Sequence, residues 1–270
     1  METEYKKTQI SLHIGIGFLL FAITIEFALI LVLNNGFLVY TQVDPYIHMA
    51  LSENIKNWNY GINISEFSAP SSSILWPFII MPFSVYEYAP FIINIAAAIG
   101  AVFVIIKILS ASIDIENYRI NNAIIATCSI FVILATNIIG LTFTGMEHSL
   151  QVLIVLFVAY GLIVEVEKKE AASWFLAAVI VAPLIRYECL AISIAVVAYL
   201  LLRGYLKQGV IVIALIAIFL GAFSVFLISL GLDPFPTSVL AKSSVVESGG
   251  ALHSLIANIK SSLYSERQGR

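Results

Sequence analysis

Residues 11–33 read SLHIGIGFLLFAITIEFALILVL, a long apolar run with a single carboxylate, Glu26. About 20 helical residues cross the roughly 30 Å hydrocarbon core of a bilayer, so this run predicts a membrane span. Lys6 and Lys7 precede it, but the run is too long for a signal-peptide core and has no small-residue cleavage site. We therefore expect it to remain in the protein as an anchor.

The composition of the whole chain extends this interpretation. Of its 270 residues, 60% are hydrophobic and only 11% are charged, and the mean hydropathy is +0.97. Such a chain is typical of an all-α polytopic membrane protein, because a lipid-facing surface replaces the usual polar exterior. A net charge of −3 without a basic run argues against nucleic acid as a partner. Cys128 and Cys189 lie in or beside apolar segments, which favours buried thiols over a disulfide.

Together with six further apolar segments, this first run predicts about seven spans. The seven are residues 11–33, 88–109, 121–140, 148–164, 171–186, 189–203 and 209–231. The fifth and sixth are short and share a polar junction, which favours a helical hairpin. Residues 73–84 are also apolar, but the segment is short and contains two prolines, so we interpret it as an interfacial or partly inserted helix and not as a span.

The distribution of basic residues predicts the orientation. With the N-terminus in the cytoplasm, the inner loops carry the pairs Lys107/Arg119, Lys168/Lys169 and Arg203/Lys207. This agrees with the positive-inside rule, whereas counting residues 73–84 as a span would reverse every later loop. We expect a multi-pass cell-membrane protein with a module at residues 1–245, a first external loop at residues 34–87 and a polar tail at residues 246–270.

This topology places four polar groups on the outer face. They are Asp44-Pro-Tyr-Ile-His48, Thr144-Gly-Met-Glu-His148, Arg186-Tyr-Glu188 and the segment 233–242, which ends in Lys242. Acids, bases and histidines that converge at one membrane surface are typical of a catalytic site. Glu26, inside the first span, is interpreted instead as a helix-packing residue.

Each group also has a structural interpretation. Asp44 at an N-cap with Pro45 at the first helical position is a strong helix start, yet the same carboxylate could deprotonate an acceptor hydroxyl. His48 could contact a phosphate or be a surface residue. Glu147 could simply be favoured by the helix dipole, and with His148 it forms only a weak metal signal, so no metal or cofactor is indicated.

The basic residues of the outer face have the same two interpretations. Arg186 and Glu188 could form a mutual ion pair, or Arg186 could contact a phosphate in a bidentate manner. Lys242 could add a second positive charge to such a site, or its side chain could simply extend toward the membrane surface.

The order of these elements resembles a known family. Asp44-x-Tyr-Ile, Glu53-Asn54-Ile55, Gly61 and Ser71-Ser-Ser-Ile-Leu-Trp76 resemble the first external loop of GT-C-fold, polyprenyl-phosphate-dependent glycosyltransferases. Gly145-Met-Glu147, Arg186-Tyr-Glu188 and Pro236-Thr-Ser-Val-Leu-Ala-Lys242 resemble the terminal arabinofuranosyltransferase branch. The resemblance extends over about residues 1–245. The family's enzymes commonly continue into further spans and an external domain, so we expect a minimal module or a truncated product.

The resemblance implies a seven-helix module with an external active site. It implies that the partners are a polyprenyl-phosphate-linked sugar, a glycan or lipid acceptor, and membrane lipids. Asp44 and Glu147 would be catalytic. The donor phosphate or the substrate would be bound by Arg186, Lys242, His48, Tyr46, Asn54, His148 and Glu188.

Three other hypotheses remain open. An oligosaccharyltransferase-like protein shares the Asp-Pro-Tyr-x-His pattern but should carry a Trp-Trp-Asp motif, which this sequence lacks. A transporter or flippase could line its pathway with Glu26 and Arg186, although such proteins often show internal repeats. A catalytically inactive membrane scaffold is the third.

Overall fold

The computed structural model describes residues 2–240, and helices are the only regular elements in that range. This confirms the all-α prediction. Lys242 and the tail at residues 246–270 lie outside the described residues. Cys128 and Cys189 are free thiols, and Glu26 in α1 (Glu2–Leu33) is half-buried.

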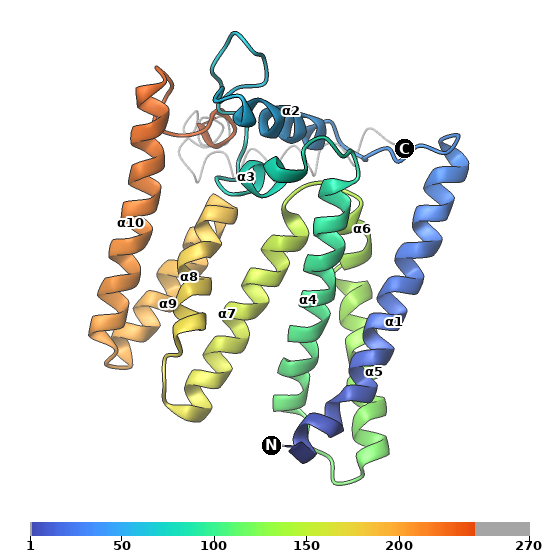
Figure 1. The fold of residues 1–270 in the computed structure, drawn as a ribbon. Coiled ribbons are helices and arrows are strands. Elements are labelled where there is room, and N and C mark those ends of the chain that lie inside the picture. The colour runs from blue at the N-terminus through green and yellow to red at the C-terminus, as the bar shows by residue number, and fades with distance from the viewer. Residues whose placement is uncertain (1, 241–270) are drawn as a thin grey trace, which may run out of the picture.

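Five helices are long and apolar enough to cross a membrane, which makes this a multi-pass membrane architecture (Figure 1). They are α1 from Gln9 onward, α4 (Ala89–Ser112), α5 (Tyr118–Ala135), α7 (His148–Lys168) and α10 (Leu206–Ser229). The expected hairpin is formed by α8 (Ser173–Ile185) and α9 (Leu190–Leu202), joined by the 3₁₀ turn η2 (Tyr187–Cys189). With 13 residues each, α8 and α9 are about 20 Å long and shorter than a full hydrocarbon core.

The third predicted span differs from the prediction at its end. The side chain of Asn117 accepts hydrogen bonds from the backbone N–H groups of Arg119 and Ile120, and this cap starts α5 earlier than expected. The helix then ends at Ala135, because Asn137 adopts a left-handed conformation with φ 52°. The short helix α6 (Ile138–Thr142) follows, so residues 121–140 are two helices and not one.

Two helices lie across one end of the bundle. Figure 1 shows α2 (Asp44–Lys56) running crosswise there, with α3 (Trp76–Ile80) beside it, followed by the 3₁₀ turn η1 (Met81–Phe83). The expected cap of α2 is wrong by one position: Val43 is the N-cap, and Asp44 is already inside the first turn. The buried face of α2 includes the polar residues His48, Ser52 and Asn54, so this helix packs on protein.

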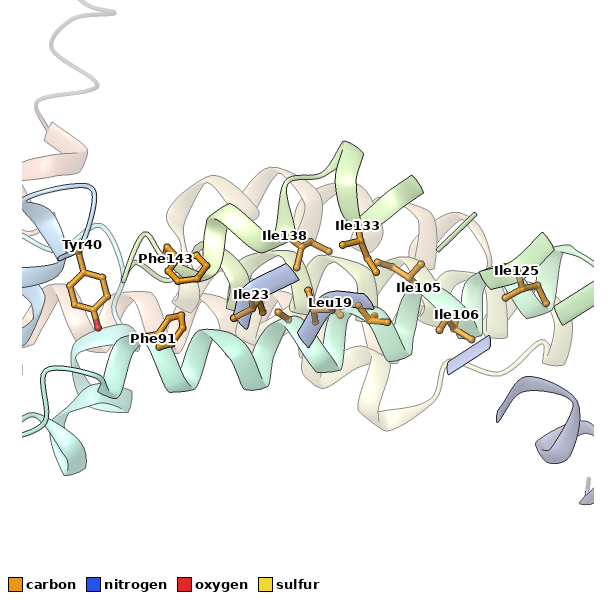
Figure 2. Packing of buried hydrophobic residues seen from close by; sticks show 13 residues of the cluster. Leu19, Ile23, Tyr40, Phe91, Ile105, Ile106, Ile125, Ile133, Ile138 and Phe143 are labelled. Carbon is orange, nitrogen blue, oxygen red and sulfur yellow. The ribbon is translucent and has the colours of Figure 1, made fainter. Parts of the chain in front are cut away.

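The core has three parts. The first fills the space between α1, α4, α5 and α6, with Leu19, Ala98, Ile105 and Ile133 fully or almost fully buried (Figure 2). A second joins α7 to α10, and a third lies beneath α2 and includes Leu51, Leu184 and Leu227. Large apolar side chains point outward from the long helices instead, such as Phe21, Leu29, Ile218 and Val225. These outward side chains suit contact with lipid.

The connections divide between the two ends of the bundle. Figure 1 shows α2, α3, the α6–α7 connection, the α8–α9 turn and the end of α10 at one end. The start of α1 and the α4–α5, α7–α8 and α9–α10 connections lie at the other end. The chain segments that carry the predicted site therefore share one end, while Lys168, Lys169 and Arg203 lie at the opposite end.

Candidate active site

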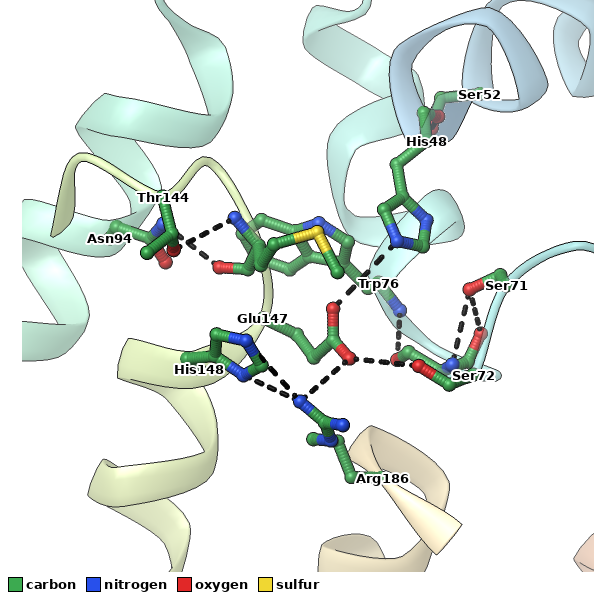
Figure 3. A network of polar contacts seen from close by, with 12 residues as sticks. His48, Ser52, Ser71, Ser72, Trp76, Asn94, Thr144, Glu147, His148 and Arg186 are labelled. Carbon is green, nitrogen blue, oxygen red and sulfur yellow. Dashed lines mark hydrogen bonds and ion pairs between the residues drawn. The ribbon is translucent and has the colours of Figure 1, made fainter. Parts of the chain in front are cut away.

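The centre of the polar cluster is Glu147, the residue immediately before α7 (Figure 3). Its side chain is fully buried. Ser72 Oγ donates a hydrogen bond to Glu147 Oε1 over 3.3 Å, and Arg186 Nη1 lies 3.6 Å from the same oxygen. His48 Nε2 lies 3.9 Å from Glu147 Oε2. One carboxylate thus collects side chains from α2, from the loop before α3 and from the α8–α9 turn.

A tight turn places Glu147 at this point. Asn94 on α4 donates a hydrogen bond from Nδ2 to the carbonyl of Met146 over 2.9 Å. Gly145 has φ +67°, and a Cβ there would lie 2.6 Å from Tyr40 and 2.8 Å from Pro45. Glycine is required on both counts, since it allows the left-handed conformation and the close approach of the turn to the start of α2.

Arg186 is the second shared residue of the cluster. Its Nε and Nη2 donate to the two carboxylate oxygens of Glu188 over 3.2 and 3.1 Å. Its Nη1 donates to Nδ1 of His148. Because a guanidinium can only donate, the ring of His148 is the acceptor in this contact. The ion pair between Arg186 and Glu188 that the sequence allowed is therefore present.

Burial shifts the pKa values of the two central groups, Glu147 and His48. It raises the pKa of Glu147 above its usual range, while nearby Arg186 works in the opposite direction. It lowers the pKa of His48 to about 4, although Asp44 acts to raise it. His48 is consequently neutral at neutral pH. Within the described part of the chain, His48 Nδ1 and Glu147 Oε2 are buried polar atoms without a hydrogen-bond partner.

An open pocket of about 410 Å³ adjoins this cluster. It is lined by Leu141, His148, Gln151, Val152, Arg186 and Glu188. The first two turns of α7 supply three of these residues, because positions 148, 151 and 152 share one helix face. Four of the six lining side chains are polar or charged (His148, Gln151, Arg186 and Glu188), and Leu141 and Val152 are apolar. The pocket is amphipathic.

Not every predicted residue reaches the cluster. Asp44 is exposed at the start of α2, one turn before His48. Tyr46 accepts a hydrogen bond from the backbone N–H of Tyr40 over 3.1 Å. Asn54 Nδ2 donates to the carbonyls of residues 61 and 62, both over 2.8 Å, and so holds the loop after α2. Glu147, His148, Arg186, Glu188 and His48 are brought together.

Two residues of the site were missed from the sequence. Ser72 hydrogen-bonds to Glu147, and its signal was the Ser71-Ser-Ser73 run. Gln151 lines the pocket, and its signal was the spacing of three from His148 on a helix. Among the residues whose side chains the structure describes, 9–240, no three His, Cys, Asp or Glu side chains are grouped as a metal ion would need.

A second buried carboxylate lies at the other end of α7. Glu165 is fully buried, and it accepts a hydrogen bond from the hydroxyl of Tyr199 on α9. Arg203 Nη2 lies 3.3 Å from Glu165 Oε1. This cluster connects α7 to the end of α9, whereas the Glu147 cluster connects α7 to the residues before α9.

Comparison with known proteins does not assign the chain to a family. No protein-family model matches the chain, and searches of curated proteins and of solved structures return no significant match.

Proposed function

We propose that this protein is a membrane glycosyltransferase that moves a sugar from a polyprenyl-phosphate donor to a glycan or lipid acceptor. The observation that carries the proposal is that Arg186 and His148 line an open pocket with both polar and apolar walls, and that Arg186 also lies 3.6 Å from the buried Glu147. A lipid phosphate has the matching chemistry, with an anionic group joined to a long apolar chain.

The pocket supports a specific placement of the donor. The phosphate would lie against Arg186, whose planar fork suits two oxygens of one anion. Leu141 and Val152 would contact the first part of the prenyl chain, which would continue into lipid. The sugar would then lie toward Glu147 and α2, where polar side chains are gathered.

The chemistry then needs mainly a base and correct positioning. The acceptor hydroxyl would attack the anomeric carbon, and its proton would pass to Asp44. The bond between that carbon and the phosphate oxygen would break, and the leaving phosphate would keep the electron pair beside Arg186. Glu147 would orient the acceptor or share the role of base. One displacement of this kind inverts the anomeric configuration.

The charge distribution supports an external site. Lys168, Lys169 and Arg203 lie at the end of the bundle opposite to Glu147 and Arg186. Basic residues near span ends favour the cytoplasmic side. We therefore place the N-terminus in the cytoplasm and the proposed active site at the outer face.

The test is direct. Purified protein in lipid nanodiscs is incubated with radiolabelled polyprenyl-phosphate sugars and with candidate acceptor glycans or lipids. The proposal expects release of free polyprenyl phosphate together with a labelled acceptor. If a panel of pentose and hexose donors gives no release above a protein-free control, the proposal is wrong.

A further inference from the structure

The guanidinium of Arg186 is already bound in a bidentate manner. Its Nε and Nη2 each donate to a different oxygen of Glu188, over 3.2 and 3.1 Å. Carboxylates and phosphates bind the arginine fork with the same paired geometry. A phosphate can therefore use this edge of Arg186 only after the carboxylate of Glu188 has left it.

The two carboxylates around Arg186 differ in how easily they can move. The Glu147 side chain is fully buried and accepts a hydrogen bond from Ser72. The Glu188 side chain is 49% exposed and lines the open pocket. An exposed carboxylate regains water when it leaves its partner, whereas a buried one does not. Glu188 is the partner that can be exchanged.

We propose that Glu188 is an internal competitor that occupies the Arg186 fork until an anionic lipid phosphate displaces it. The inference rests on the proposed function, since it assigns the anion that replaces Glu188. A sugar-linked prenyl phosphodiester carries one negative charge, so the exchange replaces one monoanion with another. The released prenyl phosphate can carry a second charge, and competition by Glu188 then also helps the product to leave.

The experiment measures binding, with undecaprenyl phosphate as the probe. Native mass spectrometry of the detergent-purified full chain gives the dissociation constants for the wild type, Glu188→Gln and Arg186→Gln. Glu53→Gln is the matched control, because Glu53 is an exposed glutamate on α2 at the same end of the bundle. Glu188→Ala repeats the loss of the carboxylate in case the amide forms new contacts. A thermal unfolding curve confirms that each variant is folded.

We expect both Glu188 variants to bind undecaprenyl phosphate about three- to fivefold more tightly, as the loss of an exposed competing ion pair predicts. Glu53→Gln should bind like the wild type, and Arg186→Gln should lose most of the binding. If Arg186→Gln loses binding and the Glu188 variants are not tighter, the competitor role is overturned and the phosphate site stands. If Arg186→Gln binds like the wild type, the donor site itself is wrong.

Discussion

The carboxylate of Glu147 and the guanidinium of Arg186 lie 3.6 Å apart, from Oε1 to Nη1, where the start of α7 meets the end of α8. A buried ion pair gains little net stability, because desolvation of both charges offsets their attraction. The pair is therefore better explained by a role at a site than by a role in holding the helices together. The Oε2 atom of Glu147 adds to this argument, because it is buried without a hydrogen-bond partner, which is unusual for a carboxylate that only holds a fold together.

The first prediction concerns the charge of Glu147. Glu147→Gln keeps the shape of the side chain and an oxygen for the Ser72 hydroxyl, but it removes the negative charge beside Arg186. We expect sugar transfer to fall by on the order of a hundredfold or more, as for loss of a catalytic acid or base. Ser72→Ala is the control, because it removes one hydrogen bond and keeps the carboxylate. Near-normal turnover by Glu147→Gln would contradict the role of this residue.

The second prediction concerns Asp44. Because Val43 is the N-cap and Asp44 is exposed, Asp44→Asn should change the free energy of unfolding by less than about 0.5 kcal/mol. Transfer should nevertheless fall by on the order of a hundredfold or more, since the proposed base is lost. Radiolabel transfer and a thermal unfolding curve are measured on the same preparation, with Glu53→Gln as the charge-matched control. An Asp44→Asn variant with normal turnover would remove Asp44 from the mechanism.

The third prediction concerns pH and His48. Its pKa is about 4 in the folded protein and 6.5 in an ordinary environment. The unfolded chain therefore binds a proton more readily, and the stability that neutral His48 contributes is present above pH 6.5 and lost as the pH falls toward 4. The loss between pH 7 and pH 4 should be roughly 3 kcal/mol.

Thermal midpoints of the wild type and His48→Gln over this pH range provide the measurement. Burial raises the pKa of Glu147, so the contribution of Glu147 has the opposite sign and declines as the pH rises through its folded pKa. Both proteins contain Glu147, and the difference between their profiles isolates His48. Profiles that stay parallel from pH 7 to pH 4 would show that His48 is not the titrating group.

Much of this architecture could be predicted from the sequence, because hydrophobic length and basic loops are local signals. The apolar segments became helices, and the residues from the predicted outer loops came to one end of the bundle. Helix ends were less predictable. Asn137 adopts a left-handed conformation that divides residues 121–140 into two helices, and the Thr136-Asn137 pair was the only local sign of this break inside an apolar segment.

The partners of polar residues were the least predictable part. Residues 165–170, read as Glu-Val-Glu-Lys-Lys-Glu, look like a solvated charge run. Glu165 is nevertheless fully buried, while Glu167 and Glu170 are exposed. The difference depends on Tyr199 and Arg203, which are distant in the sequence and reach Glu165 only after α9 packs against its neighbours.

The fourth prediction tests this second buried carboxylate. Glu165→Gln removes the charge that Arg203 faces and weakens the hydrogen bond from Tyr199. We expect a lower thermal midpoint than for Glu167→Gln, which removes the same charge from an exposed position two residues away. A double-mutant cycle with Arg203→Gln gives the pairwise contribution. Additive effects of the two substitutions would show that Glu165 and Arg203 do not interact.

The last prediction compares two reasons why a position needs glycine: a left-handed backbone conformation, and a lack of space for a Cβ. Gly145 and Gly36 both have positive φ, +67° and +91°. A Cβ at Gly36 would meet nothing within 4 Å, whereas a Cβ at Gly145 would lie 2.6 Å from Tyr40 and 2.8 Å from Pro45. Gly36→Ala should therefore cost only the backbone strain, about 1 kcal/mol. Gly145→Ala adds a steric clash, typically a further 1–3 kcal/mol, that separates the Glu147 turn from α2.

The two alanine variants also differ in their expected activity. Displacement of the turn at Gly145 moves Glu147 away from His48, so Gly145→Ala should lower transfer as well as the thermal midpoint. Gly36→Ala lies in the α1–α2 connection and should leave the transfer rate of the folded protein unchanged. Thermal unfolding and radiolabel transfer are measured on both variants, and the comparison shows whether Gly145 has a role beyond backbone conformation. Equal losses in the two variants would mean that the close approach of Gly145 to Tyr40 and Pro45 does not hold the site together.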